Sequence, residues 1–372
     1  MEGMYMTTRE NIMAVLNYEK FDVFPTVAFG YWPEVLFKWK AEGHIPFEVT
    51  ADACRDGGQQ DQAVMKLLGF DHNWNTTIAG NYFISPGFTR EVLETKPDGS
   101  QIIRTSLGTY EMIKPGINSI PAQMGTSLVD REAWETLYLP QLKWDESRAD
   151  IEVLERDPDV PVGIYCGSMI GNIRNMLGVE GLSYLYVDDE ELFAEVIDTC
   201  AELTYKCIET MLNRGHKVDY AHFWEDICYK NGPLVSPYVF EQYVGPHYKK
   251  MTDLLKKHGI NIVSVDCDGY IDHLLPIWLK NGVNTMFPIE FGTWEAAFGP
   301  WREKYGRELR GVGGMNKHIF AMDYKAIDKE IERLRPYIEM GGYIPCPDHR
   351  IMPDAIFENV QYYCDKLHNI RF

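Results

Sequence analysis

The sequence lacks the marks of a secreted, disulfide-bonded or membrane-spanning protein. Its eight cysteines are scattered, with no CxxC pair and no regular spacing, which argues against a disulfide framework and against a zinc ribbon. No apolar run approaches the roughly 20 residues that a membrane helix needs. The N-terminus has no apolar signal-peptide core after a positively charged start. These absences favour a soluble protein of the reducing cytoplasm.

Positive charge is also in short supply. The chain has 36 Lys and Arg residues against 55 Asp and Glu residues, which gives a formal net charge of −19. Nucleic acids and anionic membranes are bound by basic surfaces, so this balance argues against both as partners. We expect small molecules or other proteins instead.

Linkers, repeats and low-complexity tracts are absent too, so we expect one domain over residues 1–372. Short apolar runs alternate with longer segments of helical period, a pattern typical of a parallel sheet with helical crossovers. No Gly-rich phosphate-binding turn follows any of the runs, which favours a (β/α)8 TIM barrel over a doubly wound sheet. The eight predicted strands are 24–30, 70–78, 160–167, 217–224, 261–266, 283–290, 309–315 and 341–347.

Three segments between these strands have clear local signals. Residues 188–215 and 236–259 have helical period, and Pro246 is expected to kink the second helix. Residues 88–115 alternate at period two around an Asp-Gly turn, which predicts an antiparallel hairpin. The barrel is therefore expected to carry an inserted β-hairpin after its second strand.

Polar and titratable side chains gather directly after the predicted strands. In a (β/α)8 barrel these strand ends form the rim at which active sites lie. A carboxylate or imidazole held there must be paired, bound to a ligand or used in chemistry. The candidates at the rim are Tyr31, Trp32, His222, Glu225, Asp266, Asp268, Glu290, Cys346 and His349.

The stretch VSVDCDG ends the fifth predicted strand with two carboxylates around a thiol. In an extended chain Asp266 and Asp268 point to the same side, while Cys267 points to the other. The two carboxylates and His349 would suit one divalent ion, with zinc favoured and magnesium or manganese as alternatives. The competing interpretation has equal weight: a turn in which Asp268 bonds its own backbone beside Gly269.

Glu225 follows the fourth predicted strand in the stretch HFWEDICYKNGP. It is a candidate general acid or base, a candidate fourth metal ligand and a candidate substrate clamp. The alternative is a helix cap, which has more weight for the neighbouring Asp226 than for Glu225. His349 lies in the loop PCPDHR, where a lone histidine is more often structural than catalytic, although its polar neighbours raise its weight.

Five of the rim residues are predicted to line a substrate pocket rather than to act in chemistry. For the aromatic residues Tyr31 and Trp32, packing in the core at the mouth of the barrel is at least as good an interpretation. For the cysteine, a small buried residue is the commoner outcome. The five residues are Tyr31, Trp32, His222, Glu290 and Cys346.

The order of the motifs resembles the uroporphyrinogen decarboxylase superfamily. The resemblance is carried by FDVFPTVAFG, WEDICYKNGPLVSPYVFEQYVGPHYKKM, VDCDGYIDHLLPIWLKNGVNTMFPIE, LRGVGGMNKHIF and GGYIPCPDHRIMPDAIFENVQYY, and it is strongest from residue 217 onward. It implies a (β/α)8 barrel with one of two activities, the decarboxylation of the haem pathway or cobalamin-dependent methyl transfer.

The two branches of the family differ after the first strand. The decarboxylase has an Arg-rich MRQAGRY signature there, which grips a polycarboxylate substrate. This chain has VAFGYWPEVLFKW at that place, with no arginine, and arginine is scarce at the other strand ends. A decarboxylase or another lyase is therefore the second choice. A non-catalytic barrel that binds a small molecule is a third.

The methyltransferase branch holds zinc with a His-x-Cys pair after the fifth strand and a cysteine after the eighth. By position these ligands fall on Asp266, on Asp268 and at or beside His349, so oxygen and nitrogen replace sulfur. Such a set suits a metal that polarises an oxygen leaving group better than one that activates a thiol. In this reading Glu225, Asp268 and His349 are catalytic, and Asp266 and Glu225 complete the metal ligands.

The resemblance thus implies a corrinoid-dependent methyltransferase. It would move a methyl group from a small methylated donor, such as a methoxylated aromatic, to the cobalt of a corrinoid. No DxHxxG cobalamin motif occurs in the chain, so a separate corrinoid protein is the expected partner. A homodimer is expected from the family.

Overall fold

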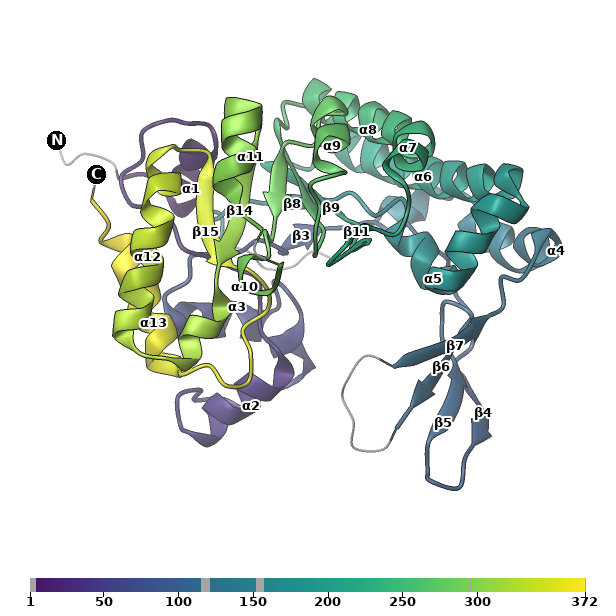
Figure 1. Ribbon diagram of the computed structural model, residues 1–372, viewed down its shortest axis with the longest axis horizontal. Coiled ribbons are helices and arrows are strands. Elements are labelled where there is room, and N and C mark those ends of the chain that lie inside the picture. The colour runs from purple at the N-terminus through teal and green to yellow at the C-terminus, as the bar shows by residue number, and fades with distance from the viewer. Residues whose placement is uncertain (1–4, 115–120, 152–156, 295, 372) are drawn as a thin grey trace.

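The computed structural model of this chain is a (β/α)8 barrel, in which short parallel strands alternate with helices that surround them (Figure 1). It describes residues 5–114, 121–151, 157–294 and 296–371. The barrel strands are β1 (Val27–Ala28), β2 (His72–Asn73), β3 (Thr77–Ile78), β8 (Gly163–Tyr165), β9 (Tyr220–Trp224), β12 (Ile262–Asp266), β13 (Thr285–Phe287), β14 (Arg310–Met315) and β15 (Tyr343–Pro347).

Parallel pairing runs around the barrel. One sheet has the order β15-β14-β13-β12-β9-β8-β3, and β1 pairs in parallel with β2, which precedes β3 by one turn. A parallel bridge between Tyr31 and Ile351 brings the end of β1 beside the end of β15. There the Trp32 amide donates to the Ile351 carbonyl, and the Ile351 amide donates to the Gly30 carbonyl, both at 3.0 Å. The predicted TIM barrel is confirmed.

Strand β12 shows why the sequence folds in this way. All five of its residues are buried, as expected for a parallel strand that is covered on both faces and is rich in β-branched side chains. Its last residue, Asp266, lies in register with Trp224 of β9 and Phe287 of β13. The barrel therefore places this carboxylate at the carboxyl-end rim, between two aromatic neighbours.

Helices cover the outside of the barrel. Their bounds are α1 (Thr8–Leu16), α2 (Pro33–Ala41), α3 (Gln59–Leu68), α4 (Arg131–Ala133), α5 (Gly171–Asp188), α6 (Glu190–Asn213), α7 (Pro237–Tyr243), α8 (Gly245–Lys257), α9 (Leu275–Lys280), α10 (Phe291–Trp294), α11 (Phe298–Tyr305), α12 (Tyr324–Glu339) and α13 (Phe357–His368). Asp189 caps α6 by accepting from the Leu192 amide at 2.8 Å. The helix expected at 236–259 is broken at Val244, two residues before Pro246.

The inserted hairpin is larger than the sequence indicated. Four strands of this insertion form an antiparallel sheet in the order β4 (Glu91–Thr95), β5 (Gln101–Arg104), β6 (Thr109–Ile113) and β7 (Ala122–Thr126). The predicted Asp-Gly turn joins β4 to β5, and residue 115, the end of the expected range, lies outside the described residues. Figure 1 shows this sheet projecting away from the barrel, with β7 against α5. Within the described residues, no helix is both long enough and apolar enough to cross a membrane.

Candidate functional site

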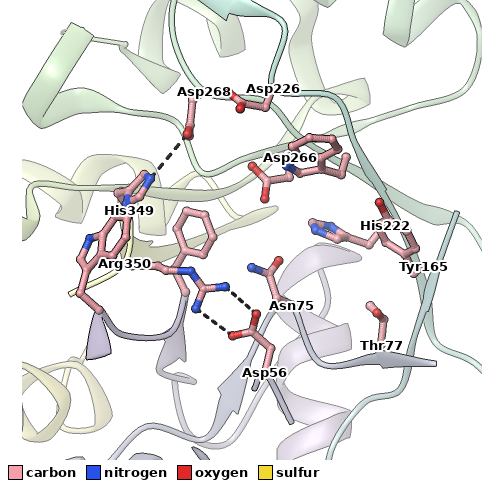
Figure 2. A pocket seen from close by; sticks show the side chains of 13 residues that line it. Asp56, Asn75, Thr77, Tyr165, His222, Asp226, Asp266, Asp268, His349 and Arg350 are labelled. Atoms are coloured by element: carbon pink, nitrogen blue, oxygen red, sulfur yellow. Dashed lines mark hydrogen bonds and ion pairs between the residues drawn. The ribbon is translucent and has the colours of Figure 1, made fainter. Parts of the chain in front are cut away.

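A cavity of about 440 Å³ lies at the carboxyl ends of the barrel strands (Figure 2). This volume is within the usual range of small-molecule sites. The side chains that line the cavity come from segments that are far apart in the sequence. They belong to Phe29, Trp32, Asp56, Asn75, Thr77, Tyr165, His222, Trp224, Asp226, Asp266, Asp268, His349 and Arg350.

Asp266 is a buried carboxyl group in the lining of the cavity. Its side chain is 6% exposed, and among the described residues no group donates a hydrogen bond to its carboxyl oxygens. Burial raises the pKa of Asp266 well above its usual value, and the nearby carboxylates of Asp268 and Asp226 raise this pKa further. The carboxyl group therefore keeps its proton to a higher pH than an exposed aspartate does.

Asp268 and His349 lie side by side on one wall of the cavity (Figure 2). The Oδ2 atom of Asp268 lies 3.6 Å from Nε2 of His349, while its Oδ1 atom is buried and has no hydrogen-bond partner among the described residues. The His349 ring stacks on Trp32, with centroids 5.8 Å apart and planes 15° apart. The imidazole is thus held between an aromatic ring and a carboxylate.

His222 is fixed by its neighbours in β9 and β12. Its Nδ1 atom lies 2.7 Å from Oγ of Ser264, and that hydroxyl donates to the Ala221 carbonyl at 3.0 Å and accepts from Nε1 of Trp74 at 3.2 Å. Because the single hydroxyl proton is directed at Ala221, we assign the ring proton of His222 to Nδ1. Burial lowers the pKa of His222 to about 3, so its Nε2 atom is a neutral acceptor.

Arg350 and Asp56 form an ion pair on another wall of the cavity (Figure 2). Two guanidinium nitrogens lie 2.6 and 3.2 Å from the two carboxylate oxygens, and Asp56 also accepts from Nδ2 of Asn73 at 2.9 Å. Gly30 has φ +92°, and a Cβ there would lie 2.5 Å from Arg350 Nη1. Arginine was expected to be scarce at the strand ends, and among the described residues Arg350, after β15, is the one arginine that lines the cavity.

Glu225 lies outside the cavity, contrary to its expected roles. Its side chain is fully buried and accepts hydrogen bonds from the amides of residues 169–171 at 2.9–3.0 Å, from the Ser168 hydroxyl at 3.0 Å and from the Tyr248 hydroxyl at 2.6 Å. These donors satisfy both carboxylate oxygens. The geometry leaves none free for a metal or a substrate, and Glu225 instead anchors the start of α5.

Three of the predicted pocket residues also lie outside the cavity lining. Tyr31 is 2% exposed and packs edge-on against Trp39, and Cys346 is fully buried in the core. Glu290 accepts from the Gly269 amide at 2.8 Å, behind the loop that carries the second aspartate. Burial, and then the charge of that aspartate, raise the pKa of Glu290 to about 7.

The comparisons with known proteins agree with this architecture. The sequence model of the family "Uroporphyrinogen decarboxylase (URO-D)" matches residues 128–370, which is more than half of the chain. The chain belongs to the uroporphyrinogen decarboxylase family. No curated protein matches it in sequence.

A solved structure supports the same fold for this URO-D family member. A methyltransferase from Methanosarcina mazei superposes with a TM-score of 0.60 at 14% identity, over 97% of this chain and 98% of that protein. A B12-independent methionine synthase from Shewanella sp. W3-18-1, in complex with selenomethionine, gives 0.49 at 10% identity, over 93% and 98%. At these identities the first likeness shows a shared fold.

The metal ion that the family resemblance implies fits this cavity poorly. Asp266, Asp268 and His349 share the cavity, but Glu225 does not. Across the described residues, no group of three or more His, Cys, Asp and Glu side chains is arranged to hold a metal ion. Zinc sites in proteins need three or four such ligands. We therefore derive no chemical step through a metal.

Several lining residues were missed from the sequence. Asn75 and Thr77 lie within the second predicted strand, which a turn at residues 74–75 splits into β2 and β3, so Asn75 lies in the turn and Thr77 begins β3. Asp56 belongs to the segment before α3 and reaches the site through its pairing with Arg350. Arg350 directly follows His349 in the chain. Its charge, in a loop that already held a candidate site residue, was the one sequence signal that could have identified it as a lining residue.

Proposed function

We propose that this member of the URO-D family transfers a methyl group from a small methylated donor to a corrinoid carried by a separate protein. The observation that carries the proposal is the charge of the cavity. Four aspartates line it against a single guanidinium, which is already paired with Asp56. A tetrapyrrole with many carboxylates would be repelled there, which disfavours the decarboxylase alternative.

Two further observations support methyl transfer. The protein from Methanosarcina mazei that shares the fold over almost the full length of both chains is a methyltransferase. The cavity also lies at the carboxyl ends of the strands, where (β/α)8 enzymes act. A site at this rim is accessible to a cofactor that a second protein presents.

The chain's own residues have defined tasks in such a reaction. A reduced corrinoid would supply the nucleophile that accepts the methyl group. The donor atom keeps the electron pair of the broken bond, so an oxygen leaving group needs a proton and a cationic nitrogen does not. Asp266 retains a proton because it is buried, and it faces the cavity where the donor would lie. The rings of Phe29 and Trp32 supply apolar walls.

A methyl-transfer assay tests the proposal. The purified chain is incubated with cob(I)alamin, free or on a corrinoid protein, and with a panel of methoxylated aromatics, methylated amines and methylated thiols. Loss of the cob(I)alamin absorbance with one donor class is expected. The variant Asp266→Asn should slow this loss at least about tenfold, while the control Asp365→Asn, on the exposed side of α13, should not. No change with any donor would overturn the proposal, as would decarboxylation of uroporphyrinogen.

A further inference from the structure

The cavity has two chemically different ends, and we propose that the donor is a zwitterion, a small N-methylated amino acid. Its cationic, methyl-bearing nitrogen lies at Asp266 and Asp268, and its carboxylate lies on Arg350. The methyl-transfer role of this ligand rests on the proposed function, whereas its binding does not. Figure 2 shows Asp266 and Arg350 on different sides of the cavity, with Asn75 near the Arg350–Asp56 pair.

The cation end is defined by carboxylate oxygens without partners. The Asp266 side chain is 94% buried, lines the cavity and accepts no hydrogen bond from the described residues. The Oδ1 atom of Asp268 is buried and has no hydrogen-bond partner within the described ranges, while its Oδ2 atom lies 3.6 Å from Nε2 of His349. Buried carboxylates in this position require a proton or a cation. A bound cation would replace the proton on Asp266, so Asp266 at the end of β12 and the partly exposed Asp268 two residues later create a subsite for one positive charge.

The other carboxylates of the cavity already have cations. Asp56 is paired with Arg350 at 2.6 Å. Asp226 is paired at 3.2 Å with Arg174, whose guanidinium lies over the Trp224 ring. The carboxylates of the cavity that have no arginine partner are therefore those at and just after the end of β12.

Aromatic rings beside this subsite favour an organic cation over a hydrated inorganic ion. Trp32 stacks on His349, and Phe29 packs against the same imidazole with centroids 5.3 Å apart. Both aromatic side chains line the cavity. Methylated ammonium groups are stabilised by aromatic faces, because their charge is spread over C–H groups that pack on the ring.

The subsite for the ligand carboxylate is the guanidinium of Arg350, which Asp56 holds in place. Asp56 takes two of the five N–H groups of Arg350 and is itself held by Asn73. Among the described residues, no other side chain or carbonyl accepts from this guanidinium. The remaining N–H groups can donate to a ligand carboxylate, and Asn75 adds an amide at the same wall.

An N-methylated cation also suits the transfer chemistry. The corrinoid partner's nucleophile supplies the electron pair of the new bond to the methyl carbon. The pair of the broken C–N bond stays on nitrogen, which leaves as a neutral tertiary amine. No proton donor and no Lewis acid are needed, and the positive charge that Asp266 and Asp268 stabilise leaves the donor with the methyl group.

Isothermal titration calorimetry with matched ligands tests the binding. Trimethylglycine and 4-(trimethylammonio)butanoate are the zwitterions. 3,3-Dimethylbutanoate lacks the positive charge, choline lacks the carboxylate, and 4-methoxybenzoate is an ether that carries a carboxylate. At least one zwitterion is expected to bind about tenfold more tightly than each of the other three, which corresponds to about 1.4 kcal/mol. No binding of either zwitterion, or equal binding of any comparison ligand, would overturn the proposal.

Variants test which residue binds the cation of the ligand and which binds its carboxylate. Asp266→Asn should weaken zwitterion binding about tenfold and leave 3,3-dimethylbutanoate unaffected. Arg350→Gln should weaken zwitterion binding and leave choline unaffected. Should either fold poorly by circular dichroism, Asp268→Asn and the double variant Asp56→Asn/Arg350→Gln replace them, the latter removing both charges of the pair. Equal losses for all ligands would contradict the assignment of the ends.

The outcomes separate this inference from the proposed function, because the titrations need no corrinoid. A zwitterion that binds at both ends but never donates a methyl group would leave the ligand class standing and remove the methyltransferase role. Demethylation of 4-methoxybenzoate, with no zwitterion binding, would support methyl transfer and overturn the zwitterion.

Discussion

Asp268 and His349 follow different barrel strands, β12 and β15, yet Oδ2 of the first lies 3.6 Å from Nε2 of the second. The contact joins two loops on one side of the cavity. The Trp32 ring, stacked on His349, closes this side of the site. A carboxylate, an imidazole and an indole thus form one wall whose members are brought together only by the closed barrel.

The first prediction concerns that wall. His349→Gln removes the ring that stacks on Trp32 and the partner of Asp268, so the rate of methyl transfer should fall at least about tenfold. The contact between His349 and Asp268 joins two partly exposed side chains, and its loss should lower the free energy of unfolding by about 1 kcal/mol or less. Initial rates and urea unfolding would be compared with those of Asp365→Asn. A normal rate would show that this wall takes no part in catalysis.

The second prediction concerns the pH dependence of stability. The pKa of Asp266 is raised in the folded chain, so the folded state still holds this proton at pH values where the unfolded chain, with a pKa of about 3.9, has lost it. The contribution of Asp266 to stability therefore falls as the pH rises from about 4 through the folded pKa. Asp266→Asn lacks this loss.

Urea unfolding midpoints at acidic and alkaline pH measure this effect. Asp266→Asn should become more stable relative to the wild type as the pH rises, because only the wild type must give up the proton on this carboxyl group. A constant difference between the two proteins across this range would show that the carboxyl group titrates normally.

The third prediction concerns the anchor of α5. Glu225→Gln replaces a carboxylate that accepts five hydrogen bonds, so an amide N–H₂ must face N–H and O–H donors. The loss should lower the free energy of unfolding by about 3 kcal/mol. Glu303→Gln, on the exposed surface of α11, is the matched control. Unchanged stability with a selective loss of catalysis would return Glu225 to the role predicted from the sequence.

The sequence predicted correctly those features that depend on a single strand. The period of two in a strand predicts that Asp266 and Asp268 face the same side, and both line the cavity while Cys267 does not. The barrel itself was predictable because each of its strands is a separate apolar run. These features depend on local spacing and on the burial of whole segments.

The remainder depends on contacts between distant segments. Glu225 directly follows a strand, as a catalytic residue would, but its donors come from the start of α5 and from Tyr248. Asp56 and Arg350 are 294 residues apart in the chain and meet only in the folded barrel. A single sequence shows the residue types at the rim, but not which of them turn inward.

The fourth prediction concerns Tyr31, which the sequence placed in the substrate pocket. Its hydroxyl is buried and has no hydrogen-bond partner among the described residues. Tyr31→Phe removes a polar group that gains nothing from burial, so the free energy of unfolding should stay the same or rise by about 1 kcal/mol. Donor binding, measured by calorimetry, should not change. Weaker binding in this variant would place the hydroxyl in the site.

The last prediction concerns metal. Within the described residues, Asp266, Asp268 and His349 do not form a three-ligand group, so we expect no stoichiometric zinc after dialysis against a chelator and no loss of donor binding. A bound ion stabilises a folded protein by about 2.7 kcal/mol at a concentration 100 times its Kd. Added zinc should therefore leave the thermal midpoint unchanged. One zinc per chain that survives dialysis in the wild type and is lost in Asp268→Ala would instead establish a metal site whose side chains come together when the ion binds.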